Sequence, residues 1–117
     1  MTAQPNPGQS RWTKVASWQT RPDGNQRACA TCGTVVRGYR YRFHPDASSL
    51  FERCIGLAWC SGCRVYEATI VYVPRDEILA DALADLPADR QEQLRRSERK
   101  LVEYLASRDL GELQAGL

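Results

Sequence analysis

The sequence predicts an α+β protein in which a small antiparallel β-sheet is followed by two C-terminal helices. Three observations support this class. Two C-x-x-C pairs flank a central segment, apolar and polar residues alternate around them, and beyond residue 74 the apolar residues recur at helical spacing. The 117 residues are enough for one ordinary domain.

Residues 1–26 are predicted to form a flexible N-terminal arm, because several prolines and glycines lie there among polar residues. Trp12 and Trp18 interrupt this composition. Buried indoles stabilise packing, so we expect both tryptophans to dock back on the domain rather than to wait for a partner.

Five cysteines carry the strongest signal, and four of them form the pairs Cys29-x-x-Cys32 and Cys60-x-x-Cys63. A two-residue separation lets a tight turn direct both sulfurs at one ion. Zn²⁺ takes four such ligands in a tetrahedron. Gly33 follows the first pair and Gly62 lies inside the second, and glycine permits the tight backbone. The spacing predicts one structural Zn²⁺ held by Cys29, Cys32, Cys60 and Cys63.

Other uses of these cysteines are weaker, although iron–sulfur chemistry stays open because four thiolates also suit iron. Disulfides rarely persist in a reducing cytosol, and a thioredoxin-like site needs a βαβ pattern that is not present. Cys54 is interpreted as a small buried apolar residue, with a substitute ligand or a reactive thiol as the alternatives. His44, the single histidine, precedes a proline and is expected in a solvated loop.

Three strands are predicted around the cysteine pairs. Residues 34–43 alternate, with Tyr39, Tyr41 and Phe43 on one face and Arg40 and Arg42 on the other. Residues 55–59 lead into the second pair. Residues 67–73, which are rich in β-branched and aromatic side chains, lead out of it.

Residues 75–107 are predicted to form a helical hairpin that packs on or near the sheet, and residues 108–117 a frayed tail. The first helix would present Ile78, Leu79, Ala82, Leu83 and Leu86. Pro87 suits the first turn of the second helix, whose apolar stripe would be Leu94, Leu101, Val102 and Leu105. A domain this small gains from the extra buried surface.

Over residues 27–74 the chain resembles the zinc-ribbon fold group: Cys29-x-x-Cys32-Gly33, a strand, Cys60-x-x-Cys63 and another strand occur in that order. The resemblance implies that these four cysteines are the metal ligands. It is specific for architecture and implies no single function. Two departures are the long segment 33–59 between the pairs and the additional Cys54.

Charge and length exclude some classes of protein. No segment approaches the roughly 20 apolar residues of a membrane helix, and Met1–Ser10 lacks the apolar region of a signal peptide, so we expect a cytoplasmic protein. The net charge is only +2. Residues 1–75, however, carry ten basic and four acidic residues, whereas residues 76–117 carry six and ten.

We therefore predict a non-enzymatic zinc ribbon that acts as a protein-interaction or regulatory adaptor, with a homodimer through the C-terminal helices as one form of partner. The alternative is a nucleic-acid-binding ribbon that contacts phosphates through Arg37, Arg40 and Arg42. An enzyme is not expected, because the sequence offers no Ser–His–Asp set, phosphate loop or carboxylate–histidine cluster.

Overall fold

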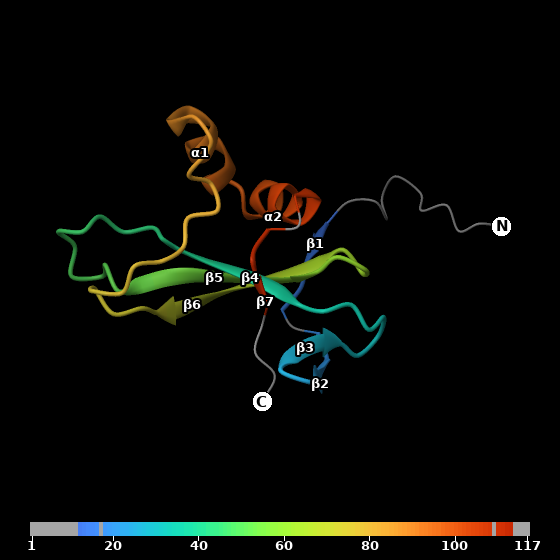
Figure 1. The fold of residues 1–117 in the computed structure, drawn as a ribbon. Helices are drawn as coiled ribbons and strands as arrows, with labels where there is room; N and C mark the ends of the chain where they lie inside the picture. The colour runs from blue at the N-terminus through green and yellow to red at the C-terminus, as the bar shows by residue number, and fades with distance from the viewer. Residues whose placement is uncertain (1–11, 17, 109, 114–117) are drawn as a thin grey trace.

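The computed structural model describes residues 12–16, 18–108 and 110–113 and confirms the α+β class (Figure 1). The elements follow in the order β1 (Thr13–Lys14), β2 (Thr20–Asp23), β3 (Gln26–Cys29), β4 (Arg37–Arg42), β5 (Arg53–Cys60), β6 (Val65–Tyr72), α1 (Ala88–Arg95), α2 (Glu98–Ser107) and β7 (Glu112–Leu113). None of the helices in these ranges is both long and apolar enough to span a bilayer.

The main sheet has the strand order β1-β6-β5-β4-β7, and its antiparallel centre is formed by β4, β5 and β6. These correspond to the three strands predicted at residues 34–43, 55–59 and 67–73. β1 runs parallel to the start of β6, and β7 pairs with the start of β4. β2 and β3 form a separate two-stranded sheet that carries the first cysteine pair.

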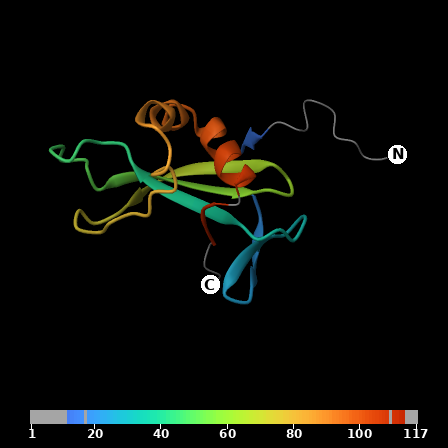
Figure 2. The same cartoon turned by 45° about the horizontal axis from the view of Figure 1, so that its top comes forward.

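The hydrophobic core lies between the main sheet and the C-terminal segment. Both helices lie on one side of the sheet and the β2–β3 hairpin lies on the other (Figures 1 and 2). Trp59, the largest of the fully buried side chains, is 1% exposed. The buried residues of the cluster are Trp12, Tyr39, Tyr41, Leu57, Trp59, Tyr66, Leu83, Leu94, Leu101, Val102 and Leu105.

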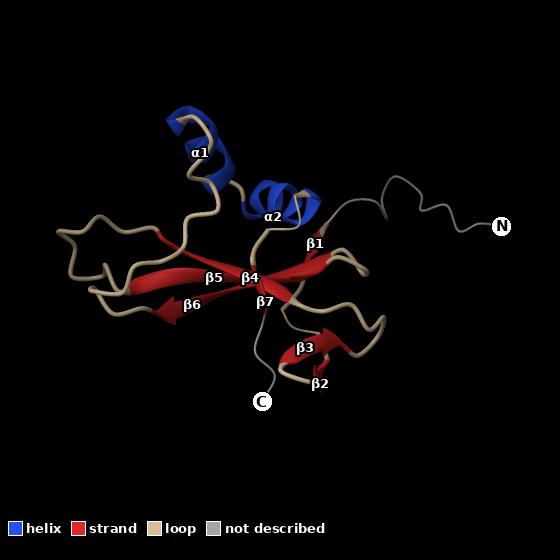
Figure 3. Cartoon of the chain, viewed as in Figure 1, coloured by secondary structure: helices blue, strands red, loops and turns tan. Residues whose placement is uncertain are grey.

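The helix predicted over residues 78–86 is wrong. This segment connects β6 to α1 through turns and extended backbone (Figure 3). The carboxylate of Asp81 accepts hydrogen bonds from the backbone N–H of Leu83 at 3.0 Å and from Arg95 at 3.3 Å. Such local side-chain bonds compete with helical ones. Leu83 is fully buried, as expected, but Ile78 is 93% exposed.

The segment after Pro87, in which one helix was expected, forms the two helices α1 and α2 instead. Pro87 precedes the first residue of α1, and the Ser97 hydroxyl caps α2 by accepting a hydrogen bond from Lys100 N at 3.3 Å. A cap side chain must accept this bond and is therefore polar, so a serine between the apolar residues Leu94 and Leu101 marks the start of a new helix. The stripe itself is confirmed, since all four of its residues are buried: Leu94, Leu101, Val102 and Leu105.

The ends of the chain also differ from expectation. The segment expected to be a flexible arm contains β1 and β2, and β3 begins at Gln26, so the boundary at residue 27 matches no change in structure. Trp12 is 8% exposed within the core, as predicted. At the other end Glu112 and Leu113 pair with β4 instead of fraying. Residues 1–11, 17, 109 and 114–117 lie outside the described part.

The aromatic face of β4 is shorter than predicted. Tyr39 and Tyr41 are buried and stacked, with ring centroids 5.8 Å apart. Phe43 follows the end of the strand, is 46% exposed and contacts the His44 ring instead of the core. The helices therefore cover only part of the sheet.

Candidate metal centre

The two C-x-x-C turns come from different sheets and meet at their tips. Cys29 ends β3 and Cys60 ends β5, so each pair begins where a strand stops. The sulfurs of Cys29, Cys32, Cys60 and Cys63 all lie within 4.8 Å of one another. Contacts of 3.8 Å (Cys29 to Cys63) and 3.4 Å (Cys32 to Cys60) connect the two pairs. The structure thus brings together all four residues that the spacing identified.

The two turns have the same backbone plan. In the first, Gly33 N donates to the Cys29 carbonyl at 2.8 Å, and Gly33 has φ +79°. In the second, Arg64 N donates to the Cys60 carbonyl at 2.9 Å, and Arg64 has φ +57°. Glycine adopts such a conformation without cost, whereas arginine is strained in it. The repeated geometry explains how two short turns present four sulfurs to one point.

Gly62 matters for a different reason, which is the close approach of the two turns. A Cβ atom at this position would lie 2.6 Å from the Cys32 sulfur and even closer to the Thr34 hydroxyl. Both contacts are shorter than non-bonded atoms allow. Only a residue without a side chain lets the second turn reach the first.

Replacing Gly62 by alanine should therefore push the turns apart and weaken metal binding by about tenfold or more. Competition with a chromogenic chelator would measure the affinity. Ser61→Ala is the matched control, because Ser61 is an exposed residue of the same turn. An unchanged affinity in Gly62→Ala would show that the turns can separate without loss.

The thiol pKa values are unequal across the cluster. Burial raises the pKa of Cys29, but hydrogen bonds from the backbone N–H groups of Cys32 and Thr31 outweigh it, and the pKa lies below its ordinary value. The Thr34 side chain lowers the pKa of Cys32 to about 6. Burial raises the pKa of Cys60, and raises that of Cys63 to about 12. The thiols of the second pair therefore hold their protons more tightly than those of the first pair.

The donor set fits a four-coordinate metal ion. At a metal–sulfur distance of ~2.3 Å, the sulfurs of a tetrahedron lie ~3.8 Å apart. The measured contacts of 3.4 and 3.8 Å are close to this separation. These four cysteines could hold one metal ion with all coordination positions taken by protein.

Cys54 and His44 lie outside this cluster. Cys54 is fully buried in β5, 3.5 Å from a guanidinium nitrogen of Arg42, which agrees with its interpretation as a small buried residue. His44 lies in the loop between β4 and β5, as expected.

Cys54→Ala should leave the metal content unchanged, because the sulfur of Cys54 is no member of the cluster. Metal analysis of the purified variant by mass spectrometry in native conditions provides the check. Loss of the ion would mean that Cys54 is a ligand and that one of the four assigned cysteines is not.

The arginines predicted to contact phosphates are occupied within the fold. Arg42 donates to the carbonyl oxygens of Phe51, Val73, Pro74 and Glu77. Arg40 pairs with the Glu77 carboxylate at 3.2 Å, and Arg37 donates to the Gly111 carbonyl at 3.2 Å. Sequence reasoning missed this role, because alternation placed these residues on a polar face without showing which loops would cross it.

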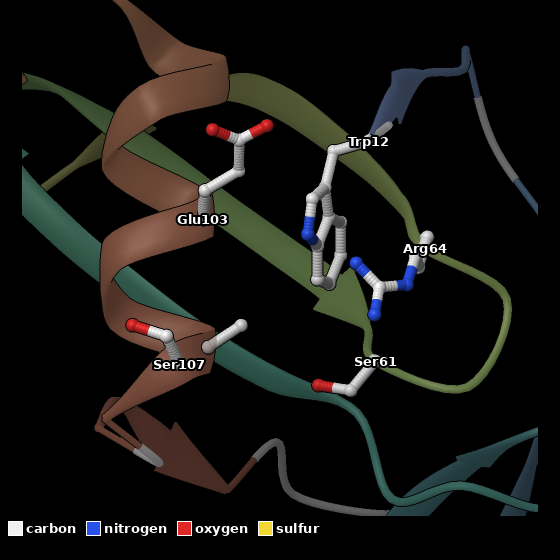
Figure 4. A pocket seen from close by; sticks show the side chains of 6 residues that line it. Trp12, Ser61, Arg64, Glu103 and Ser107 are labelled. Carbon is white, nitrogen blue, oxygen red and sulfur yellow. The ribbon is translucent and has the colours of Figure 1, made fainter. Parts of the chain in front are cut away.

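A pocket of about 410 Å³ lies beside the second cysteine turn (Figure 4). Figure 4 shows Trp12, Arg64 and Glu103 around it, with Ser61 and Ser107 at the other side. The residues that line the pocket include no histidine that could act as a general base for either serine. The pocket offers opposite charges and an aromatic wall.

Fold and site together define a small α+β protein with a candidate four-cysteine metal centre that joins two sheets. Comparison with protein-family profiles, with curated proteins and with solved structures found no match.

Proposed function

We propose that this protein is a non-enzymatic interaction module whose two sheets are joined by one structural zinc ion. The observation that carries the proposal is the convergence of four sulfurs from two turns. Cys29, Cys32, Cys60 and Cys63 would hold the ion, which supplies charge neutralisation and a cross-link but no open position for a substrate. We identify the module with the zinc-ribbon group on the order of its turns and strands.

Zinc is favoured over iron by the small, closed arrangement of single sulfur atoms around one point. An all-cysteine shell is typical of structural zinc, whereas catalytic zinc keeps a water position and uses histidine or carboxylate ligands. Thiolate ligands also need a reducing compartment, and we propose the cytoplasm for that reason.

The contacts of the basic residues favour binding of a protein over binding of nucleic acid. Arg40 and Arg42 face carboxylate or carbonyl acceptors within the fold. The stacked Tyr39 and Tyr41 rings are 6% and 7% exposed, so they offer no platform for unpaired bases. These contacts and the buried rings support the proposal of a protein partner over phosphate contacts through this strand.

Affinity purification of the zinc-loaded chain from its native cells, with and without nuclease treatment, tests the proposal. We expect specific proteins to be recovered in both cases, and we expect no salt-dependent shift of single- or double-stranded nucleic acid. Recovery that disappears with nuclease, together with such a shift, would support the nucleic-acid alternative instead.

A further inference from the structure

Most of the outer edge of β6 is unpaired in the part of the chain that the structure describes. β1 pairs only with Val65 and Tyr66, so residues 67–72 have β5 on one side and no strand on the other. In Figure 1 the arrowhead of β6 points away from β1. Natural edges are usually protected by charges or proline. Among residues 67–72 only Glu67, at the start of the open stretch, is charged, and none is proline.

The backbone groups that this edge presents can be assigned from β1. Val15 N donates to the Tyr66 carbonyl at 2.8 Å, so the groups of Tyr66 point outward. Every second residue of a strand directs its N–H and C=O to the same side. Ala68, Ile70 and Tyr72 therefore present both groups to the open edge.

A row of the hydrophobic core also ends at this edge. Tyr41 pairs with Ile55, and Ile55 pairs with Ile70, so their side chains lie in one row on the helix-covered face. Tyr41 is 7% exposed and Ile55 is partly buried against the core, whereas Ile70 is 52% exposed. Tyr72, on the same face, is 68% exposed. The row is left open at its outer end.

We propose that a second copy of this chain covers the edge, with two β6 strands antiparallel about a twofold axis at Ile70. This inference names a partner for the interaction function proposed above and rests on it. The residues at the two ends of the open stretch determine the register. The Tyr66 carbonyl already accepts a hydrogen bond from Val15, and Pro74 has no N–H to donate, so the free groups lie between them. Pairing centred on Ile70 lets Ala68, Ile70 and Tyr72 bond to the same three residues of the second copy.

The side chains on this register complement themselves. Tyr72 lies opposite Ala68 of the second copy, so a large residue faces a small one at both ends. Ile70 meets its own symmetry mate, and the row of Tyr41, Ile55 and Ile70 continues into the identical row of the other chain. A strand from an unrelated protein would not extend this row of apolar side chains in the same way. The edge is short, which predicts a weak dimer.

The helices do not compete with this surface for a second copy. Leu94, Leu101 and Leu105, which would form a helical interface, are already buried in the monomer. The sheet edge, and not the C-terminal helices as expected from the sequence, is therefore the surface of the proposed homodimer.

Sedimentation velocity of the full zinc-loaded chain, from micromolar to near-millimolar concentration, tests the association. We expect a concentration-dependent dimer. Ile70→Lys places two like charges at the axis and should weaken it by about tenfold or more. Ile78→Lys is the matched control, because Ile78 is 93% exposed and lies outside β6, and it should still dimerise.

A disulfide tests the register. The Cα atoms of a hydrogen-bonded antiparallel pair lie ~5.5 Å apart, which suits a disulfide. Ile70→Cys should therefore give a covalent dimer on mild oxidation, and Ile78→Cys should not. A wild type that stays monomeric, or equal behaviour of the paired variants, overturns the proposal. If the wild type is a monomer with full zinc content, the homodimer is rejected, but the proposed interaction function is not, because a strand of another protein could still pair with this edge.

Discussion

Cys32→Ser is expected to abolish metal binding and to lower the free energy of unfolding by about 4 kcal/mol or more. The binding energy of a structural zinc ion is on the order of 10 kcal/mol, which is comparable to the whole stability of a small domain. Cys32 is the most informative of the four ligands because its side chain is exposed, so serine there disturbs no packing. A serine at Cys60, which is fully buried, would combine both effects.

Thermal unfolding with and without a strong chelator measures this effect. The chelator should lower the Tm of the wild type and leave that of Cys32→Ser unchanged, because the variant has no ion to lose. Thr31→Ser, in the same turn, is the control and should respond as the wild type does. A wild type that keeps its Tm without metal would contradict a structural role for the ion.

Leu83→Ala is expected to cost about 2–4 kcal/mol, as truncation of a fully buried leucine does. Leu83 is 0% exposed and lies in the core although its segment has no regular structure. It anchors the connection between β6 and α1 on the sheet. Denaturant unfolding provides the free energy.

Ile78→Ala, in the same connection, should change stability by less than about 0.5 kcal/mol, because Ile78 is almost fully exposed. Comparing the two variants shows whether the loss of stability comes from burial of the side chain or from its position in this connection. If the denaturation midpoint depended on protein concentration in Leu83→Ala but not in Ile78→Ala, Leu83 would be buried by association of two chains. Equal losses in both variants would mean that the whole segment packs differently.

The cysteine site was accessible to sequence reasoning because its signal is local. A C-x-x-C turn fixes the relative positions of two sulfurs within four residues, so only the meeting of the two turns had to be inferred. The strands were accessible for a similar reason, since alternation over β4 and the β-branched and aromatic residues of β6 are both local signals of a strand. Leu94 and Leu101 were also assigned correctly to the core.

The segment from Ile78 to Leu86 shows where periodicity fails. Apolar residues at helical spacing are compatible with a helix, but they do not require one. Asp81 bonds to the Leu83 backbone and to Arg95, fourteen residues away, and this combination favours turns. The distant partner is not visible in a local pattern, so tertiary contacts overrode a weak helical preference.

Local sequence patterns were enough to predict the α+β class, the four cysteines of the candidate metal centre, the three central strands and the apolar stripe of the last helices. Each depends on spacings of two to four residues, which local backbone geometry enforces. Only long-range contacts in the fold show that Arg42 donates to the carbonyl oxygens of distant loop residues, that β1 joins the main sheet, and that most of the outer edge of β6 is unpaired among the described residues. These features depend on residues far apart in the chain, and their positions follow from how the whole fold closes its core.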